Sequence, residues 1–521
     1  MKVRLMHRDR DFDLEQDLPW NERALAQDLE LDILFRAMSN KDEHLLDVAR
    51  RAVLSGLQCD VDTILYRQEI LKDCLKNPAL VRGLYDLAVE AIESKRKSWY
   101  GYYSSYPGAI LGGSIEVLRM FVDRLRKLRE LAREQAGRFA SEGWTALFAM
   151  LGKELTDEYL ASVQHHLTAL KLRKGVLLSA QLGEGGDGGA GYVLHQPPEN
   201  GPNWLKRILG MGPPAYSFRL HERDEAGARI LSELRTRGIN LVANALAQSA
   251  DHVLSFFEAL RTELAFYVGC LNLRDRLAAK GEPLCFPAPE PGVTRAHRFN
   301  GLYDVCLTLH MEPRVVGNAV NAEGKSLAII TGPNQGGKSS FLRSIGVAQM
   351  MMQCGMFVAA ESFAAEVRGG LFTHYVREED ATMKSGKLDE ELGRMNDIVE
   401  HIVPNSMLLF NESFAATNER EGSEIARQIV CALLEKGMKI FFVTHLYDFA
   451  HGFLGRETGD TIFLRAERKT DGTRTFRLLE GDPLDTSHGE DLYTRIFAAG
   501  TEATDVRAPE DPERRSLLAS R

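Results

Sequence analysis

Apolar positions recur at helical spacing through the first third of the chain. Leu25, Leu29 and Ile33 fall at four-residue steps in a charged frame, so a helix would gather them on one face. The same type of pattern continues over residues 22–181 and returns over residues 222–280. These two blocks are therefore expected to be helical almost throughout.

The pattern changes after about residue 297, where short β-rich runs alternate with helical ones. Such alternation is typical of a parallel sheet covered by helices. The runs expected to form strands are 305–309, 327–330, 407–410 and 440–443. The chain is thus expected to combine an α-helical part with an α/β part, and no internal repeat is visible.

Glycine and proline mark the expected boundaries. A stretch rich in both residues, about 183–214, is expected to be a flexible loop. Three prolines at 287, 289 and 291 separate a region 1–295 from a domain 296–500. The polar, proline-bearing tail 501–521 has the composition of a disordered segment.

Composition narrows the class of protein. With 521 residues the chain is long enough for two or more domains, and no apolar run approaches the roughly 20 residues that cross a bilayer. Seven dispersed cysteines without a C-x-x-C pair indicate reduced thiols and a cytoplasmic protein. The net charge of −9 gives no argument for nucleic-acid binding. The best local candidate for a DNA contact is Lys95-Arg96-Lys97, which lies beside four aromatic residues.

One motif carries the chemistry. Residues 332–339 have the form G-x-x-x-x-G-K-[ST] between an apolar run and a helical pattern, which is the setting of a phosphate-binding loop. Glycines let several backbone N–H groups turn toward one anion, and the following helix adds its N-terminal dipole. Lys338 would reach the β- and γ-phosphates of ATP, and the Ser339 hydroxyl would bind Mg²⁺. The expected nucleotide-contacting residues are Gly332, Pro333, Asn334, Gln335, Gly336, Gly337, Lys338, Ser339 and Ser340.

This loop and three later segments together resemble the MutS mismatch-repair ATPases. The loop resembles T-G-P-N-x-G-G-K-S-T, and Gly355 to Ala360 resembles G-x-[FY]-V-P-A. Residues 411–422 keep the spacing of D-E-x-x-x-x-T-x-x-x-[DE]-G, and 442–445 resemble F-x-T-H. The resemblance implies a helical core and lever region followed by a P-loop ATPase domain. It also implies a form without the family's mismatch-recognition and connector domains.

The resemblance assigns further roles. Glu412 would be the general base, and His445 would sense the γ-phosphate. Asn411 stands where the family has a metal-supporting Asp, so weaker Mg²⁺ support and slow hydrolysis are expected. Asn318 resembles the loop that approaches the base. Ser385, Gly386, Thr417 and Glu421 are candidates for contacts to the nucleotide of a partner subunit.

Mismatch reading is not expected. The family's wedge is an F-x-E motif near the N-terminus, whereas here F-x-E occurs at Phe256-Phe257-Glu258, inside an amphipathic pattern that core packing explains. The preferred hypothesis is therefore a homodimeric, ATP-gated clamp that hydrolyses ATP slowly and binds duplex or branched DNA through its shape. The alternative is a nucleotide-gated scaffold for RNA or protein assemblies. A transporter-type ATPase is disfavoured because no L-S-G-G-Q-like signature occurs.

Overall fold

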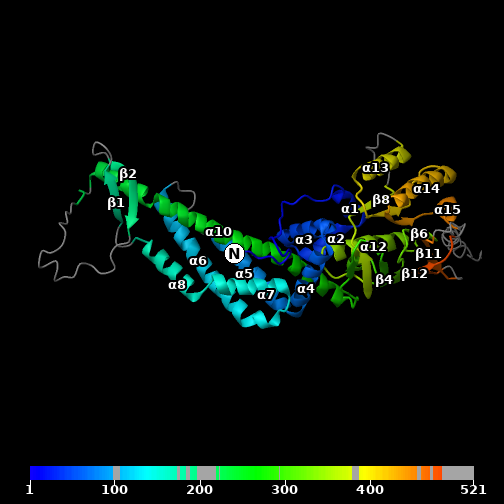
Figure 1. The fold of residues 1–521 in the computed structure, drawn as a ribbon, viewed down its shortest axis with the longest axis horizontal. Coiled ribbons are helices and arrows are strands. Elements are labelled where there is room, and N and C mark those ends of the chain that lie inside the picture. The colour runs from blue at the N-terminus through cyan, green and yellow to red at the C-terminus, as the bar shows by residue number, and fades with distance from the viewer. Residues whose placement is uncertain are drawn as a thin grey trace, which may run out of the picture. The chain divides into compact units, whose positions relative to one another are not determined.

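The computed structural model describes residues 1–97, 106–172, 176–182, 188–195, 219–221, 223–292, 294–377, 386–454, 459–469 and 473–483. It divides into two compact units (Figure 1). Unit 1 comprises residues 1–16, 38–50 and 65–273, and unit 2 comprises 17–37, 51–64 and 274–521. The expected tail 501–521, Ser385 and most of the 183–214 stretch lie outside the described residues.

Helices dominate the chain up to Ala279, as the periodicity predicts. They are α1 (Glu22–Asp28), α2 (Leu31–Ser39), α3 (Glu43–Ser55), α4 (Val61–Lys76), α5 (Pro78–Lys97), α6 (Pro107–Gln135), α7 (Glu142–Glu154), α8 (Asp157–Ala169) and α10 (Glu225–Ala279). Short 3₁₀ turns follow α3 and α6. Within the described part of the chain, no helix is long and apolar enough to cross a membrane.

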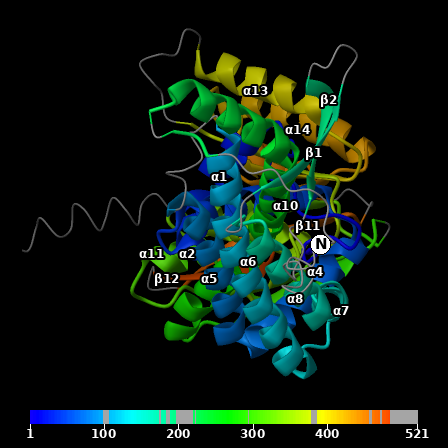
Figure 2. The same cartoon turned by 90° about the vertical axis from the view of Figure 1, so that its left-hand side faces the viewer.

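Unit 1 is built around the 55-residue helix α10. Figures 1 and 2 both show α5 and α6 side by side with it. Phe121 of α6 packs against Phe257 of α10 with ring centroids 5.7 Å apart. Both Phe256 and Phe257 are buried, so the F-x-E sequence serves the core, as expected from its periodicity.

A buried carboxylate fixes the N-terminal segment of unit 1. Glu263 of α10 is fully buried and accepts hydrogen bonds from the backbone N–H groups of Leu5, Met6 and Phe12. Tyr267, one turn further along the helix, donates its hydroxyl to the Leu5 carbonyl, 2.5 Å away. The first residues of the chain are therefore tied to a helix about 260 positions later.

One expectation for unit 1 is wrong, and the candidate DNA contact at 95–97 has one of its charges buried. Leu177–Leu182 (β1) and Gly188–His195 (β2) form an antiparallel pair, where a helix end and an irregular loop were expected. Backbone hydrogen bonding between the two segments overrides the weak local preference of glycine. Lys95 is buried and forms an ion pair with Asp251, 2.7 Å away, so the basic cluster at 95–97 does not present this charge to DNA.

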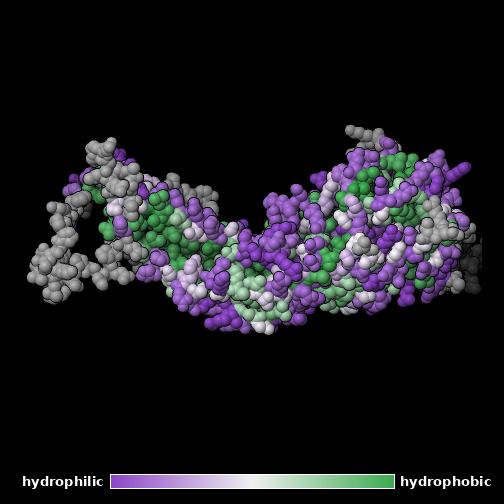
Figure 3. All heavy atoms as spheres, in the orientation of Figure 1, coloured by the Kyte–Doolittle hydropathy of each residue, from purple (hydrophilic) through white to green (hydrophobic). Residues whose placement is uncertain are grey.

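Some apolar side chains of unit 1 remain at its surface. Ile230, Leu231 and Leu241 of α10 are all exposed. The space-filling view shows hydrophobic surface over the part of this unit where α10 begins (Figure 3). The polar and charged residues of the same helices face solvent elsewhere, which is the ordinary distribution for an amphipathic bundle.

Unit 2 contains the mixed α/β part of the chain. Its larger sheet has the order β12-β11-β6-β10-β9-β8, in which β12 is antiparallel and the other neighbours are parallel. The strands are β6 (Leu327–Thr331), β8 (Gly370–Tyr375), β9 (Ser406–Asn411), β10 (Lys439–Val443), β11 (Thr461–Arg468) and β12 (Arg474–Glu480). A second sheet has the order β3-β7-β4-β5, formed by β3 (Ala288–Glu290), β4 (His297–Leu302), β5 (Asn318–Asn321) and β7 (Ser362–Glu366).

Three of the four expected strands are confirmed, and they are neighbours in the larger sheet as β6, β10 and β9. The fourth expectation is wrong, because Val305–His310 forms a helix, α11. Its Asp304 accepts a hydrogen bond from the Leu307 N–H and caps the helix start, which decides the conformation of a run whose β-branched residues favour a strand. The other helices of unit 2 are α12 (Lys338–Gln353), α13 (Lys387–His401), α14 (Glu419–Glu435) and α15 (Tyr447–His451).

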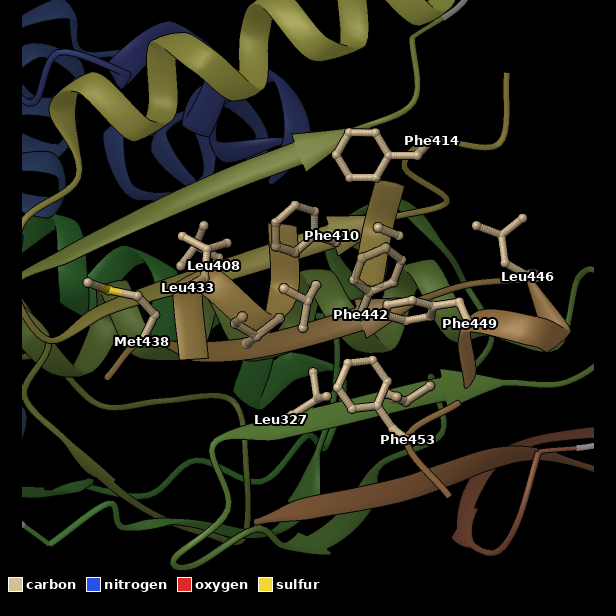
Figure 4. Packing of buried hydrophobic residues seen from close by; sticks show 14 of the residues in the cluster. Leu327, Leu408, Phe410, Phe414, Leu433, Met438, Phe442, Leu446, Phe449 and Phe453 are labelled. Carbon is tan, nitrogen blue, oxygen red and sulfur yellow. The ribbon is translucent and has the colours of Figure 1, made fainter. Parts of the chain in front are cut away.

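Aromatic packing fills the space between this sheet and its helices. Phe410 of β9 stacks on Phe442 of β10, with ring centroids 4.9 Å apart, and Phe442 contacts Phe449 of α15 (Figure 4). All three side chains are buried. A rigid core therefore holds the carboxyl ends of β9, which ends at Asn411, and of β10, which His445 follows.

Two early segments of the chain belong to unit 2. Asn21 donates its side-chain amide to the Leu371 carbonyl of β8, 2.8 Å away. Arg343 of α12 forms ion pairs with both Glu30 and Asp304. Residues 17–37 are thus an integral part of the α/β unit.

Candidate functional site

The loop between β6 and α12 has the backbone that the motif predicts. Gly332 and Gly337 have φ values of 119° and 87°, and Gly337 is the residue just before α12. A Cβ on Gly332 would lie 2.9 Å from the Ala466 nitrogen of β11. Glycine is thus required at this turn by both conformation and space.

Lys338 lies at the floor of this loop, with only 4% of its surface exposed. Its Nζ donates to the carbonyl oxygens of Gly332, at 2.9 Å, and Pro333, at 3.1 Å. Burial lowers the pKa of Lys338 to about 8, partly opposed by the Glu412 carboxylate. An anionic ligand in the loop would oppose this effect and raise the pKa of Lys338, because a nearby negative charge stabilises the charged amine.

Ser339 and Asn411 bring two oxygen atoms together. Ser339 is the second residue of α12, Asn411 ends β9, and the Ser339 hydroxyl donates to Asn411 Oδ1 over 3.1 Å. Uncharged oxygens beside a phosphate site fit Mg²⁺, which keeps several waters and takes few protein ligands. No cluster of three or more His, Cys, Asp or Glu side chains suited to a metal occurs within the described ranges.

Glu412 and His445 meet at the carboxyl ends of β9 and β10. His445 Nε2 lies 2.8 Å from Glu412 Oε1. This hydrogen bond is the main reason that the pKa of Glu412 is lowered, with the Lys338 charge contributing in the same direction. The carboxylate is therefore ionised at neutral pH, and it accepts a hydrogen bond from the Nε2–H group of His445.

The backbone that presents Glu412 is unusual. Glu412 and Phe414 have φ values of 57° and 64°, a left-handed conformation that is unfavourable for such side chains. Buried hydrogen bonds hold this turn: the Phe414 N–H donates to Glu391 Oε2 at 2.8 Å, and the Ser413 hydroxyl lies 2.7 Å from His374 Nδ1. The Glu412 N–H donates to the Val443 carbonyl of β10.

A cavity of about 430 Å³ opens beside these groups. Its lining includes Asn318, Phe341, Lys338, Glu412 and Phe476, together with the loop residues 334–340. Sequence analysis missed Phe476, which has 48% of its surface exposed and a φ of 59°. An exposed aromatic ring at a cavity wall is a surface on which a planar base stacks.

Asn318 lies in this cavity wall, but its amide is used by the protein. It donates to the Phe476 carbonyl at 3.3 Å and accepts from the Leu478 N–H at 2.7 Å. Asn318 therefore positions β12 and the Phe476 ring. The only signal for Phe476 in the sequence is an alternating run at residues 474–480 that indicates an edge strand.

The candidate trans contacts lie on two helix starts. Thr417 donates its hydroxyl to Glu421 at 2.8 Å, and Asn418 caps α14. Gly386 directly precedes α13 and is exposed. A Cβ on Gly422 would lie 2.3 Å from the Phe414 carbonyl, so Gly422 permits α14 to approach the turn that carries Glu412.

Comparison with known proteins gives two matches to family models. Residues 59–280 match the model described as the MutS2 N-terminal domain, and residues 328–494 match MutS domain V. The chain is 30% identical over 243 residues to Endonuclease MutS2 of Thermus thermophilus, which covers 46% of this chain and 29% of that protein. It is 26% identical over 290 residues to the DNA mismatch repair protein MutS of Streptococcus pneumoniae, covering 53% and 34% respectively.

A further relative is the DNA mismatch repair protein MutS of Lactobacillus acidophilus, with 26% identity over 276 residues and coverage of 48% of this chain and 31% of the relative. The chain thus matches about a third of the length of each of these relatives.

Proposed function

The chain belongs to the MutS family, and from this premise we propose that it is a slow ATPase that acts on DNA. The observation that carries the proposal is that Lys338, Ser339 and Glu412 line one cavity. Asn411 is hydrogen-bonded to Ser339, and His445 is hydrogen-bonded to Glu412. These residues come from the start of helix α12 and from the carboxyl ends of β9 and β10, two neighbouring strands of the larger sheet. The carboxyl ends of parallel strands are where such folds bind their ligands.

Each residue has a role that its surroundings support. Lys338 exchanges its two carbonyl partners for phosphate oxygens and becomes fully charged as the triphosphate enters. Glu412, ionised and hydrogen-bonded to His445, orients and deprotonates the attacking water. His445 reports the state of the γ-phosphate through the same hydrogen bond. Phe476 stacks on the base.

Mg²⁺ would be held by Ser339 and, directly or through water, by Asn411, and when bound it neutralises charge on the phosphates. Asn411 supplies a carbonyl oxygen without charge, so this side chain supports a divalent cation less strongly than a carboxylate does. Slow hydrolysis with intact nucleotide binding is the expected consequence.

The proposed assembly is a homodimer that clamps duplex or branched DNA. Ser385, Gly386, Thr417 and Glu421 would complete the site of the partner subunit, and unit 1 would supply the helical core and lever. DNA is favoured over an RNA or protein scaffold because the relatives are named for DNA mismatch repair. Because Phe256 and Phe257 of the F-x-E sequence are buried, we expect DNA shape and salt to govern binding more than a single mismatch.

Two variants and a control test the nucleotide site. Lys338→Ala is expected to abolish tight ATP binding, whereas Glu412→Ala should bind ATP and fail to hydrolyse it. Lys436→Ala, an exposed lysine at the end of α14, is the matched control and should behave as wild type. Equilibrium binding of a fluorescent ATP analogue and phosphate release measure the two steps separately. Wild-type affinity in Lys338→Ala would refute the assignment.

Salt-dependent binding to homoduplex, mismatched and branched DNA, with and without ATP, tests the DNA part of the proposal. Tight binding to RNA with none to any DNA would overturn it.

A further inference from the structure

A second cavity in unit 2 lies at the amino ends of the strands of the larger sheet, away from the proposed ATP site. It has a volume of about 320 Å³ and is lined by residues next to the amino ends of the strands. Lys439 begins β10, Asn405 directly precedes β9, and Arg368 lies two residues before β8. The proposed ATP site uses the carboxyl ends of the same strands, so the two cavities are separate.

Positive charge predominates in this second cavity. Four basic side chains line it, those of Arg295, Lys325, Arg368 and Lys439. Glu366 is the one acidic residue in this lining. Arg295 is exposed and lies 3.7 Å from Asp460, a distance too long for a strong pair. The cavity therefore concentrates cationic groups around a space large enough for a small ligand.

Arg368 is the central group. It is buried, with 3% of its surface exposed, and its Nη1 donates to Asn405 Oδ1 at 2.7 Å. Its Nη2 lies 3.2 Å from Glu366 Oε2, but neither atom makes a hydrogen bond there, and no described residue accepts from Nε. Buried guanidinium N–H groups without acceptors are costly.

The position of Arg368 is fixed by the protein. Its backbone N–H donates to Gln353 Oε1 at 2.9 Å, and its carbonyl accepts from Gln353 Nε2 at 3.0 Å. Gln353 is itself buried at the end of α12. The guanidinium is therefore held in place before any ligand arrives, which lowers the entropic cost of binding.

Lys439 adds a second buried cation, with 2% of its surface exposed. Its Nζ donates to the Ala322 carbonyl at 3.0 Å and to the Lys325 carbonyl. Burial, together with the charge of Arg368, lowers the pKa of Lys439 to about 7. A bound anion would offset both effects.

We propose that this cavity binds a small ligand bearing a doubly charged phosphate group. The guanidinium fork of Arg368 matches the geometry of phosphate oxygens, while Arg295 and Lys325 supply further charge at the rim. Two sources share this chemistry, free inorganic phosphate and a small phosphomonoester. The depth of Arg368 and Lys439 favours a terminal phosphate group that enters the cavity.

Calorimetry with the full chain tests the proposal. The Lys338→Ala background is used because it weakens phosphate binding at the ATP site. If this variant keeps its ATP affinity, the result counts against the proposed function and not against the second cavity. In this background, orthophosphate and glycerol 3-phosphate are titrated separately. The rim variant Arg295→Gln with Lys325→Gln is expected to weaken binding about tenfold or more. Arg298→Gln, an exposed arginine of β4 outside the cavity, is the control.

Each outcome has a meaning. Binding that is weakened about tenfold or more in the rim variant and retained in Arg298→Gln supports the site. The ligand that binds more tightly identifies the source of the phosphate. Equal affinity in the rim variant and the control, or no binding of either ligand at about 1 mM, would overturn the proposal. Thermal unfolding of each variant confirms that the fold is retained.

Discussion

Replacing Glu391 with leucine is expected to slow ATP hydrolysis without weakening ATP binding. Glu391 is 1% exposed, and its Oε2 accepts from the Phe414 N–H at 2.8 Å. Leucine fills similar space but leaves that N–H buried without this acceptor, at a cost of about 1–3 kcal/mol. The turn from Glu412 to Phe414 already contains two left-handed side-chain-bearing residues, each costing roughly 1–2 kcal/mol. The lost hydrogen bond is therefore comparable in energy to the strain that it helps to offset, and the turn is expected to relax.

The consequence falls on Glu412. A displacement of about 1 Å at a catalytic group can reduce a rate by about 100-fold, so kcat should fall between about 10-fold and 100-fold. The contacts of Lys338 are unchanged, and the dissociation constant for ATP should stay within about twofold, a change well below 1 kcal/mol. Single-turnover hydrolysis and equilibrium binding separate these two effects.

Two companion variants sharpen the assay. Glu391→Gln keeps an amide oxygen as acceptor and should recover most of the rate. Glu400→Leu makes the same chemical change at an exposed position of α13 and should leave hydrolysis unchanged. A leucine variant that hydrolyses ATP like wild type would show that Glu391 does not position Glu412.

Three other measurements probe different parts of the molecule. Asn411→Asp is expected to raise turnover and to lower the Mg²⁺ concentration needed for half-maximal rate, since a carboxylate supports the cation better; superimposable Mg²⁺ titrations would exclude Asn411 from the metal site. Burial raises the pKa of Glu263 from 4.5 to about 7, so the folded state holds its proton more tightly. Unfolding free energy from urea titrations should therefore fall by about 3 kcal/mol as the pH rises through 4.5–7, and Glu263→Gln should lack this component. A non-hydrolysable ATP analogue should shift sedimentation from monomer to dimer, and a monomer under every nucleotide and DNA condition would contradict the composite site.

The sequence predicts the parts of unit 2 that depend on local pattern. The strand–loop–helix setting of Lys338 and the runs that became β6, β9 and β10 are local features, because buried parallel strands are continuous apolar runs. Since Asn411 and His445 follow neighbouring strands, their approach to the loop also follows from the pattern. These are the elements for which local preference and tertiary packing agree.

Other features depend on contacts between distant segments. The residues of α11 favour a strand by composition, but a side-chain cap at Asp304 and the Asp304–Arg343 ion pair fix a helix there. Phe476 reaches the cavity because β12 pairs with β11 and because Asn318 binds its backbone. Neither relation is visible in the residues around position 476, so the base-stacking candidate could not be found from the sequence.

The placement of residues 17–37 in unit 2 has a consequence for biosynthesis. This segment packs with residues that begin at position 274, and Asn21 and Glu30 find their partners Leu371 and Arg343 more than 300 positions later. At translation rates of about 5–20 residues per second, the segment leaves the ribosome roughly 15–70 seconds before these partners exist. The α/β unit can therefore close only late in synthesis, and until then α1 and α2 expose the apolar faces that a chaperone would recognise.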